Sequence, residues 1–270
     1  HPDFIAEVER VLSVLDGAVL VISAVEGVQS QTPLLMRALQ RLGVPTLIFV
    51  NKLDRVGADP DRVLEEISAR LTPAIVPVDD RARLAEVLAD LDESLLAAYV
   101  EGDGLPYRRL RAELAAQTGR ALVHPVFVGS ARTGEGIDDL MSGIAELLPA
   151  SAGDAEGPAS GSVFKIERGT AGEKIAYVRM FSGTVHARER LNDEKVTAIS
   201  VFAAGDAEQR RSVSAGEIAK LWGLGSIQIG DRIGEAPPPR REFAPPTLES
   251  VIAPTDPDDG AGLRVALGQL

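Results

Sequence analysis

Asn51, Lys52 and Asp54 stand directly after the apolar run Leu47–Val50. An ionised Asp54 can accept hydrogen bonds from the ring N1–H and the exocyclic amine of guanine together, whereas adenine lacks that pair of donors. Asn51 can donate to the acceptor edge of the base and tie neighbouring loops together, while the stem of Lys52 can cover the face of the ring. These residue types at this spacing indicate a site for a guanine base.

A second polar segment, Gly129–Ala131, follows another apolar run, Val126–Val128. Its backbone amides, including those of Ser130 and Ala131, can donate to O6 of guanine; adenine carries a donor at that position and would leave them unpaired. One N-K-x-D motif alone is a modest signal, and an ordinary turn at a polar strand end would explain it. Two such segments, in this order and each after an apolar run, favour a nucleotide site.

The elements around these segments alternate between helix and strand. Apolar residues recur at helical spacing from Phe4 to Leu15 and from Leu35 to Leu42, whereas the runs 18–23 and 46–50 are apolar at nearly every position. The first pattern predicts helices, and the second predicts strands that are buried on both faces of a parallel sheet. Further amphipathic stretches lie near 63–71, 84–91 and 95–99. We expect a doubly wound α/β domain over residues 1–150, with ligands at the carboxyl ends of its strands.

The rest of the chain changes character. Residues 151–162 are rich in Gly, Ser and Ala and predict a linker. Residues 163–236 show short strands separated by glycine turns, which predicts a small β-barrel with Phe164, Phe181 and Trp222 in its core rather than on a base-stacking surface. A Pro-rich linker over 237–246 and a strand and helix that open a third domain over 247–270 complete the expected order.

Composition bounds the function classes. The 270 residues contain no cysteine, which excludes disulfides. The three histidines are scattered and lack metal-ligand spacing, so we expect no metal site. Residues 1–160 hold 14 Lys and Arg against 25 Asp and Glu, whereas residues 161–246 hold 13 against 11. Residues 161–246 are therefore the better candidate for an RNA surface, although an ordinary solvated module has the same balance of charges. Because no apolar run is long enough to span a bilayer and the chain opens on His1, we expect a cytoplasmic piece of a longer protein, with no membrane or DNA partner.

Three stretches carry a family resemblance. The segments 1–32, 49–59 and 129–140 resemble the GTP-binding domain of translational GTPases of the elongation factor G type and, within that group, the tetracycline-resistance ribosomal protection proteins. The resemblance implies that His1 aligns with the histidine that positions the attacking water, so that His1 is the catalytic residue, and that the two polar segments bind the base of GTP or GDP. It also implies that the barrel is the family's second domain, which packs on the GTP-binding domain and touches the small ribosomal subunit.

The resemblance implies a ribosome-dependent GTPase that releases tetracycline from the small subunit. Asp54 and Ser130 are only 76 positions apart, which leaves little room for the subdomain that elongation factor G inserts there. An elongation factor G-like translocase, a ribosome-release paralogue and an inactive folded module stay open as alternatives. The chain has no G-x-x-x-x-G-K-[ST] motif, and the family's Mg²⁺ ligands are missing with it, so we expect these residues alone to bind GTP no better than in the high micromolar range and to hydrolyse it negligibly.

Overall fold

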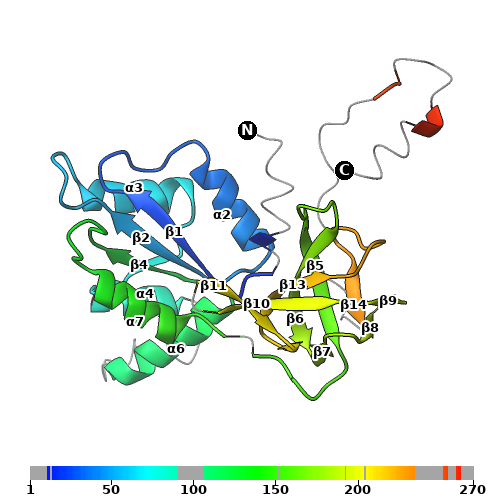
Figure 1. The fold of residues 1–270 in the computed structure, drawn as a ribbon. Coiled ribbons are helices and arrows are strands. Elements are labelled where there is room, and N and C mark those ends of the chain that lie inside the picture. Colours follow the sequence, from blue (N-terminus) through cyan, green and yellow to red (C-terminus); the bar gives the residue numbers. More distant parts are fainter. Residues whose placement is uncertain are drawn as a thin grey trace.

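The computed structural model describes residues 11–12, 14–90, 106–150, 152–191, 193–203, 205–234, 252–254 and 260–262. These residues form an α/β domain followed by a β-barrel (Figure 1). His1, residues 4–10 and 13 of the first expected helix, the stretch 95–99 and the Pro-rich linker lie outside the described residues. So does most of the expected third domain, of which only 252–254 and 260–262 are described.

The α/β domain is built on a parallel sheet with the strand order β1-β2-β4-β3. The strands are β1 (Ala18–Ser23), β2 (Thr46–Asn51), β3 (Ile75–Pro77) and β4 (His124–Val128). Their register aligns Val50 of β2 with Val128 of β4, so these two strands end side by side. The expected parallel sheet is therefore confirmed.

Helices cover both faces of this sheet. α2 (Thr32–Arg41) and α3 (Pro60–Arg70) pack on one face, and α4 (Arg81–Ala89), α6 (Tyr107–Gly119) and α7 (Ile137–Leu147) pack on the other (Figure 1). Alternate β2 residues reach the two cores, because Ile48 and Val50 contact the first group of helices while Leu47 and Phe49 contact the second. The doubly wound architecture is confirmed. Among the described helices, none combines the length and the apolar character needed to cross a bilayer.

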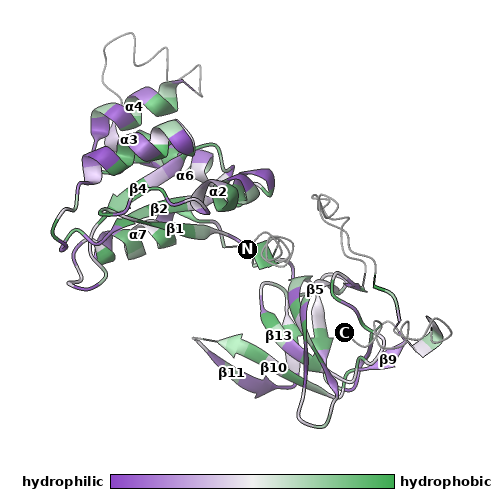
Figure 2. Cartoon of the chain, turned by 90° about the horizontal axis from the view of Figure 1, so that it is seen from above, coloured by the Kyte–Doolittle hydropathy of each residue, from purple (hydrophilic) through white to green (hydrophobic). Residues whose placement is uncertain are grey.

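The barrel is an antiparallel structure whose main sheet has the order β11-β10-β13-β6-β5-β14. Figure 2 shows it beside the α/β domain, with apolar residues along the strands of both units. The core of the barrel consists mainly of Val, Leu and Ile side chains, Val178, Val201 and Leu221 among them. The strands are β5 (Ser160–Arg168), β6 (Lys174–Ser182), β7 (Thr184–His186), β8 (Arg190–Leu191), β9 (Glu194–Lys195), β10 (Ala198–Ala203), β11 (Asp206–Arg210), β12 (Ser212–Ser214), β13 (Ile218–Trp222) and β14 (Arg232–Gly234).

Two details of the barrel differ from the sequence-based expectation. β5 begins at Ser160, so the last three residues of the expected linker already pair in the barrel sheet. Phe164, Phe181 and Trp222 are half-buried and lie outside the core cluster, so their assignment to the core was wrong. The period of two along a strand explains Trp222, because Ala219 and Leu221 of β13 face inward and Trp222 therefore faces outward.

The contact of α7 with β4 leaves no space for a larger residue at Gly143. A methyl group at this position would overlap the ring of Phe127. We expect Gly143→Ala to lower the free energy of unfolding by about 1–3 kcal/mol, because an overpacked core must displace side chains or backbone. Gly119→Ala is the matched control, since no atom lies within 4 Å of the corresponding methyl in α6. Chemical denaturation measures both variants, and equal losses would contradict the close contact.

Candidate functional site

The two polar segments meet because β2 and β4 are neighbours and end together. Gly129 N donates to Val50 O at 2.9 Å, and Leu53 N donates to Gly129 O at 3.2 Å. The backbone therefore joins the loop after β2 to the loop after β4. In open α/β sheets this edge, beyond the carboxyl ends of the strands, is where ligands bind.

Ser130 and the half-buried Asp54 form the inner part of the site. Ser130 Oγ donates to Asp54 Oδ1 at 2.6 Å, and Ser130 is fully buried. Asp54 Oδ2 is also shielded from solvent, yet it accepts no hydrogen bond from any residue that the structure describes. The nearby cations are on exposed arginines: Arg132 Nη1 lies 3.5 Å and Arg55 Nε 3.9 Å from Oδ2. The carboxylate is thus held by one oxygen and presents the other without a hydrogen-bond donor.

The environment keeps this carboxylate ionised. The hydrogen bond from Ser130 is the largest cause that lowers the pKa of Asp54, and the charges of Arg132 and Arg55 act in the same direction. Burial of the carboxylate opposes them, but the pKa stays below the ordinary aspartate value. At neutral pH Asp54 is therefore an acceptor on both oxygens.

Asn51 ties the two loops together through its side-chain oxygen. Asn51 Oδ1 accepts from Lys52 N at 2.8 Å and from Ala131 N at 2.9 Å. The amides of Gly129 and Ser130 also donate within the protein, to Val50 O and Glu135 O. The expected donation of these amides to a base is therefore not available in this arrangement, and a base that used Ala131 N would have to displace Asn51 Oδ1.

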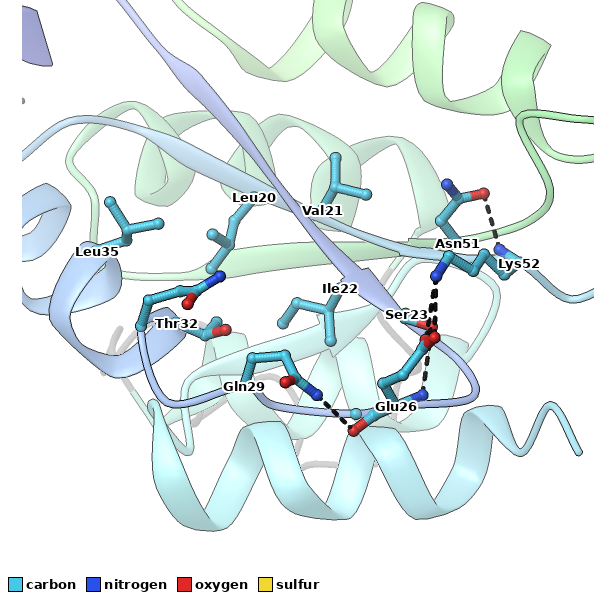
Figure 3. A pocket seen from close by; sticks show the side chains of 12 residues that line it. Leu20, Val21, Ile22, Ser23, Glu26, Gln29, Thr32, Leu35, Asn51 and Lys52 are labelled. Atoms are coloured by element: carbon cyan, nitrogen blue, oxygen red, sulfur yellow. Dashed lines mark hydrogen bonds and ion pairs between the residues drawn. The ribbon is translucent and has the colours of Figure 1, made fainter. Parts of the chain in front are cut away.

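Lys52 has an unusual backbone conformation and a partner that the sequence reasoning missed. Its φ is 75°, in the left-handed region that residues other than glycine seldom occupy. Its ammonium group pairs with Glu26 at 3.1 Å, and Glu26 also accepts from Ser23 Oγ (Figure 3). The ion pair with Lys52 lowers the pKa of Glu26. Ser23 is the last residue of β1 and Glu26 follows it, so the strand-end argument that identified the other two segments could have identified them as well.

A hollow of about 440 Å³ adjoins the site at Asn51 and Lys52. It runs along β1, where Leu20 and Ile22 line it, and reaches Thr32 at the start of α2 (Figure 3). Asp54 and Ser130 are not among its lining residues. The hollow and the carboxylate thus share the loop after β2 but do not form one closed cavity.

Of the sequence-predicted site residues, the structure brings five together at this edge: Asn51, Lys52, Asp54, Ser130 and Ala131. His1 lies outside the described residues. Within the described ranges, no three His, Asp or Glu side chains are grouped so that they could hold a metal ion. No donor set for Mg²⁺ is therefore identified in this part of the chain.

Known proteins share both units. Residues 1–150 match the family model of the elongation factor Tu GTP binding domain, and residues 158–236 match that of elongation factor G domain 2. The crystal structure of a protein from Thermus thermophilus superposes with a TM-score of 0.74 at 23% identity, covering 100% of this chain and 49% of that protein. At this level of identity the superposition shows that the fold is shared.

Named relatives are found among antibiotic resistance proteins. The chain is 47% identical to the oxytetracycline resistance protein of Streptomyces rimosus, over 100% of the chain and 46% of that protein. It is 40% identical to the tetracycline resistance protein TetM of Streptomyces lividans, over 99% of the chain and 46% of that protein. The chain thus spans about half the length of the curated relatives it matches. Because the GTP-binding model covers more than half of its residues, this chain belongs to the family of translational GTPases that share the elongation factor Tu GTP binding domain.

Proposed function

We propose that this chain is the guanine-recognising and ribosome-contacting part of a ribosome-dependent GTPase that releases tetracycline from the small ribosomal subunit. The observation that carries the nucleotide part is the ionised, half-buried Asp54, whose shielded Oδ2 has no hydrogen-bond donor among the described residues. The names of the relatives support the resistance part.

The chemistry of Asp54 fits guanine. A buried carboxylate oxygen without a donor is costly, and a ligand that supplies two adjacent N–H groups relieves that cost. Guanine presents such a pair at N1 and at the exocyclic amine, whereas adenine presents a bare acceptor at N1. Ser130 holds Oδ1 in place, so the carboxylate needs little rearrangement to accept both donors. Asn51 and Lys52 border the same site and complete the proposed base pocket.

The remaining parts of the GTPase reaction are assigned by family membership. GTP supplies the phosphoryl group, and we propose that His1 positions the attacking water in the complete protein. Mg²⁺ is proposed as the metal partner of the phosphates, although the described residues contain no group of three His, Asp or Glu side chains that could hold it. A ribosomal partner places the proposed activity in the cytoplasm.

The segment between the two base motifs favours the resistance branch. Asp54 and Ser130 are separated by 76 positions. The described residues of this segment consist largely of the sheet and its covering helices, namely α3, β3, α4, α6 and β4. An elongation factor G-like inserted subdomain is therefore not required to account for them.

The outer face of the barrel is the proposed contact with ribosomal RNA. Tyr177 stacks on Phe202 at 5.9 Å between ring centroids, and Phe164 meets Tyr177 edge-on at 6.2 Å. Lys220 Nζ lies 5.0 Å from the centroid of Tyr177 and 5.6 Å from that of Phe202. Phe202 is 39% exposed. An exposed ring beside an ammonium group suits an unpaired base and its phosphate.

Ser130→Ala tests how the site keeps Asp54 charged. The lowered pKa means that the ionised carboxylate stabilises the fold above the ordinary aspartate range, and that this contribution is lost as the pH falls through the lowered value. Without the Ser130 hydroxyl the pKa of Asp54 should rise, so that the loss begins at a less acidic pH. Carboxyl NMR titration measures the shift. Thr133→Ala, which removes a nearby hydroxyl, should leave the titration unchanged; an unmoved pKa in Ser130→Ala would contradict the assigned cause.

Asp54→Asn tests which base the site accepts. An asparagine amide can donate to the C2 oxygen of xanthine but cannot accept both guanine donors, so the preference between GDP and XDP should reverse by about tenfold or more. Weak binding is measurable by NMR with millimolar nucleotide. Asp59→Asn is the matched control, because Asp59 caps α3 by accepting from Arg62 N and asparagine caps equally well. An unaltered preference for GDP in Asp54→Asn would remove Asp54 from the base site.

A chimaera tests the resistance function and the RNA surface together. In the chimaera, this chain replaces the matching 46% of the Streptomyces rimosus oxytetracycline resistance protein. We expect cells that express the chimaera to remain resistant to oxytetracycline. Phe202→Ala in the chimaera should weaken ribosome binding by about five- to a hundredfold, because a base loses its stacking partner. Sedimentation with purified ribosomes measures binding.

Leu122→Ala is the control for the chimaera, because Leu122 is 39% exposed like Phe202 but lies on the α/β domain. A folded chimaera that gives no protection would overturn the proposed function. Protection with undiminished ribosome binding in Phe202→Ala would overturn only the proposed surface.

A further inference from the structure

An ion pair joins the α/β domain to the barrel. Arg179 Nη2 lies 2.8 Å and 3.1 Å from the two carboxylate oxygens of Asp16, and Arg179 Nη1 donates to Gly216 O at 2.6 Å. The side chain of Arg179 is 8% exposed and that of Asp16 is 34% exposed. The two residues are 163 positions apart in the sequence and belong to different units.

The strand period places Arg179 at this junction. Alternate residues of β6, Ala176, Val178 and Met180, are buried in the barrel core, so Tyr177 and Arg179 lie on the opposite face of the strand. Removing a guanidinium from water costs free energy unless a carboxylate balances its charge and further acceptors take its hydrogen bonds. Here the carboxylate comes from the other unit, so Arg179 has this partner only when the two units are docked.

The position of Asp16 is also constrained. Ala18 N donates to Pro45 O at 2.8 Å, which fixes the entry into β1. Gly17 lies between Asp16 and Ala18, and a methyl group at this position would overlap the side chain of Leu148, the residue that follows α7. The backbone beside Asp16 therefore packs closely against the end of that helix. The Asp16 carboxylate therefore projects from a segment that is fixed both by the backbone hydrogen bond to Pro45 and by the packing against Leu148.

The covalent connection is fastened where β6 ends and β7 begins. Gly183 N donates to Asp154 O at 2.7 Å, and Ser182 Oγ donates to the same oxygen at 3.2 Å. Thr184 Oγ1 donates to Ala155 O at 3.1 Å. These contacts follow Arg179 by three to five residues, so the connection and the ion pair hold the barrel at neighbouring points.

We propose that Arg179 is a positioning residue that fixes the orientation of the barrel on the α/β domain through Asp16. The pair makes the two units a single cooperative body, and a displacement of the segment that enters β1 is transmitted directly to β6. The inference is independent of the proposed nucleotide recognition, since neither residue belongs to the base site.

The full chain offers a direct measurement, because it contains no native cysteine. Spin labels can be attached to cysteines introduced at Val56 and His186, which are both exposed. Double electron–electron resonance then measures the distance between the two units. With Asp16 and Arg179 intact, the two labels should give one narrow distance distribution. Asp16→Asn and Arg179→Met should each broaden it, and Asp16→Asn should lower the melting temperature by about 5 °C or more, because it removes the carboxylate charge that faces the buried guanidinium.

Arg179→Met keeps the test informative if Asp16→Asn fails to fold, since it removes the buried charge and retains much of the apolar stem. Glu86→Gln is the matched control, because it breaks the exposed pair with Arg83, which is 2.9 Å long. The control should leave both the distances and the melting temperature unchanged. Narrow, unshifted distances in a folded Arg179→Met variant would overturn the proposal, whatever its stability.

Discussion

The pairing of β2 with β4 is the constraint on which the candidate site depends. Parallel strands in register, Val50 beside Val128, must leave the sheet at the same edge. The polar residues that follow then have one place to go, and Gly129 N to Val50 O closes the backbone between them. Burial of β2 on both faces fixes the register, because a slip of one residue would exchange Leu47 and Phe49 with Ile48 and Val50 between two differently shaped cores.

Asp54 is the residue to which we assign the proposed base specificity at this edge. The carboxylate is shielded, which alone would raise its pKa, yet the Ser130 hydroxyl and two arginine charges more than compensate. The hydrogen bond uses one oxygen, and the arginines, at 3.5 Å and 3.9 Å, answer the charge of the other without donating to it in hydrogen-bond geometry. In the proposed base site, this ionised but incompletely hydrogen-bonded carboxylate would discriminate among bases, because the wrong base leaves Oδ2 without a donor.

The sequence predicts what depends on local patterns. Buried strands, the helices α2 and α3 and the two polar segments were all readable from periodicity and spacing. β3 was not predicted, because three residues are too few to show a periodicity. The outward orientation of Trp222 was not predicted either, because aromatic character alone does not tell which face of a strand lies in the core. The occupied amide of Ala131 and the pair between Asp16 and Arg179 depend on long-range geometry, across 80 and 163 positions, that no local pattern contains.

The junction of the two units extends the same reasoning to domain arrangement. A linker rich in Gly and Ser would ordinarily let a barrel sample many orientations. Arg179 removes that freedom, because in other orientations its guanidinium would lose the carboxylate while still lying against the barrel surface. The sign of the pair agrees with the charge distribution, since the α/β domain is strongly acidic and the barrel segment is slightly basic. On this proposal, the distance between the proposed base site and the aromatic face of the barrel is set by a specific electrostatic contact rather than by the length of the linker.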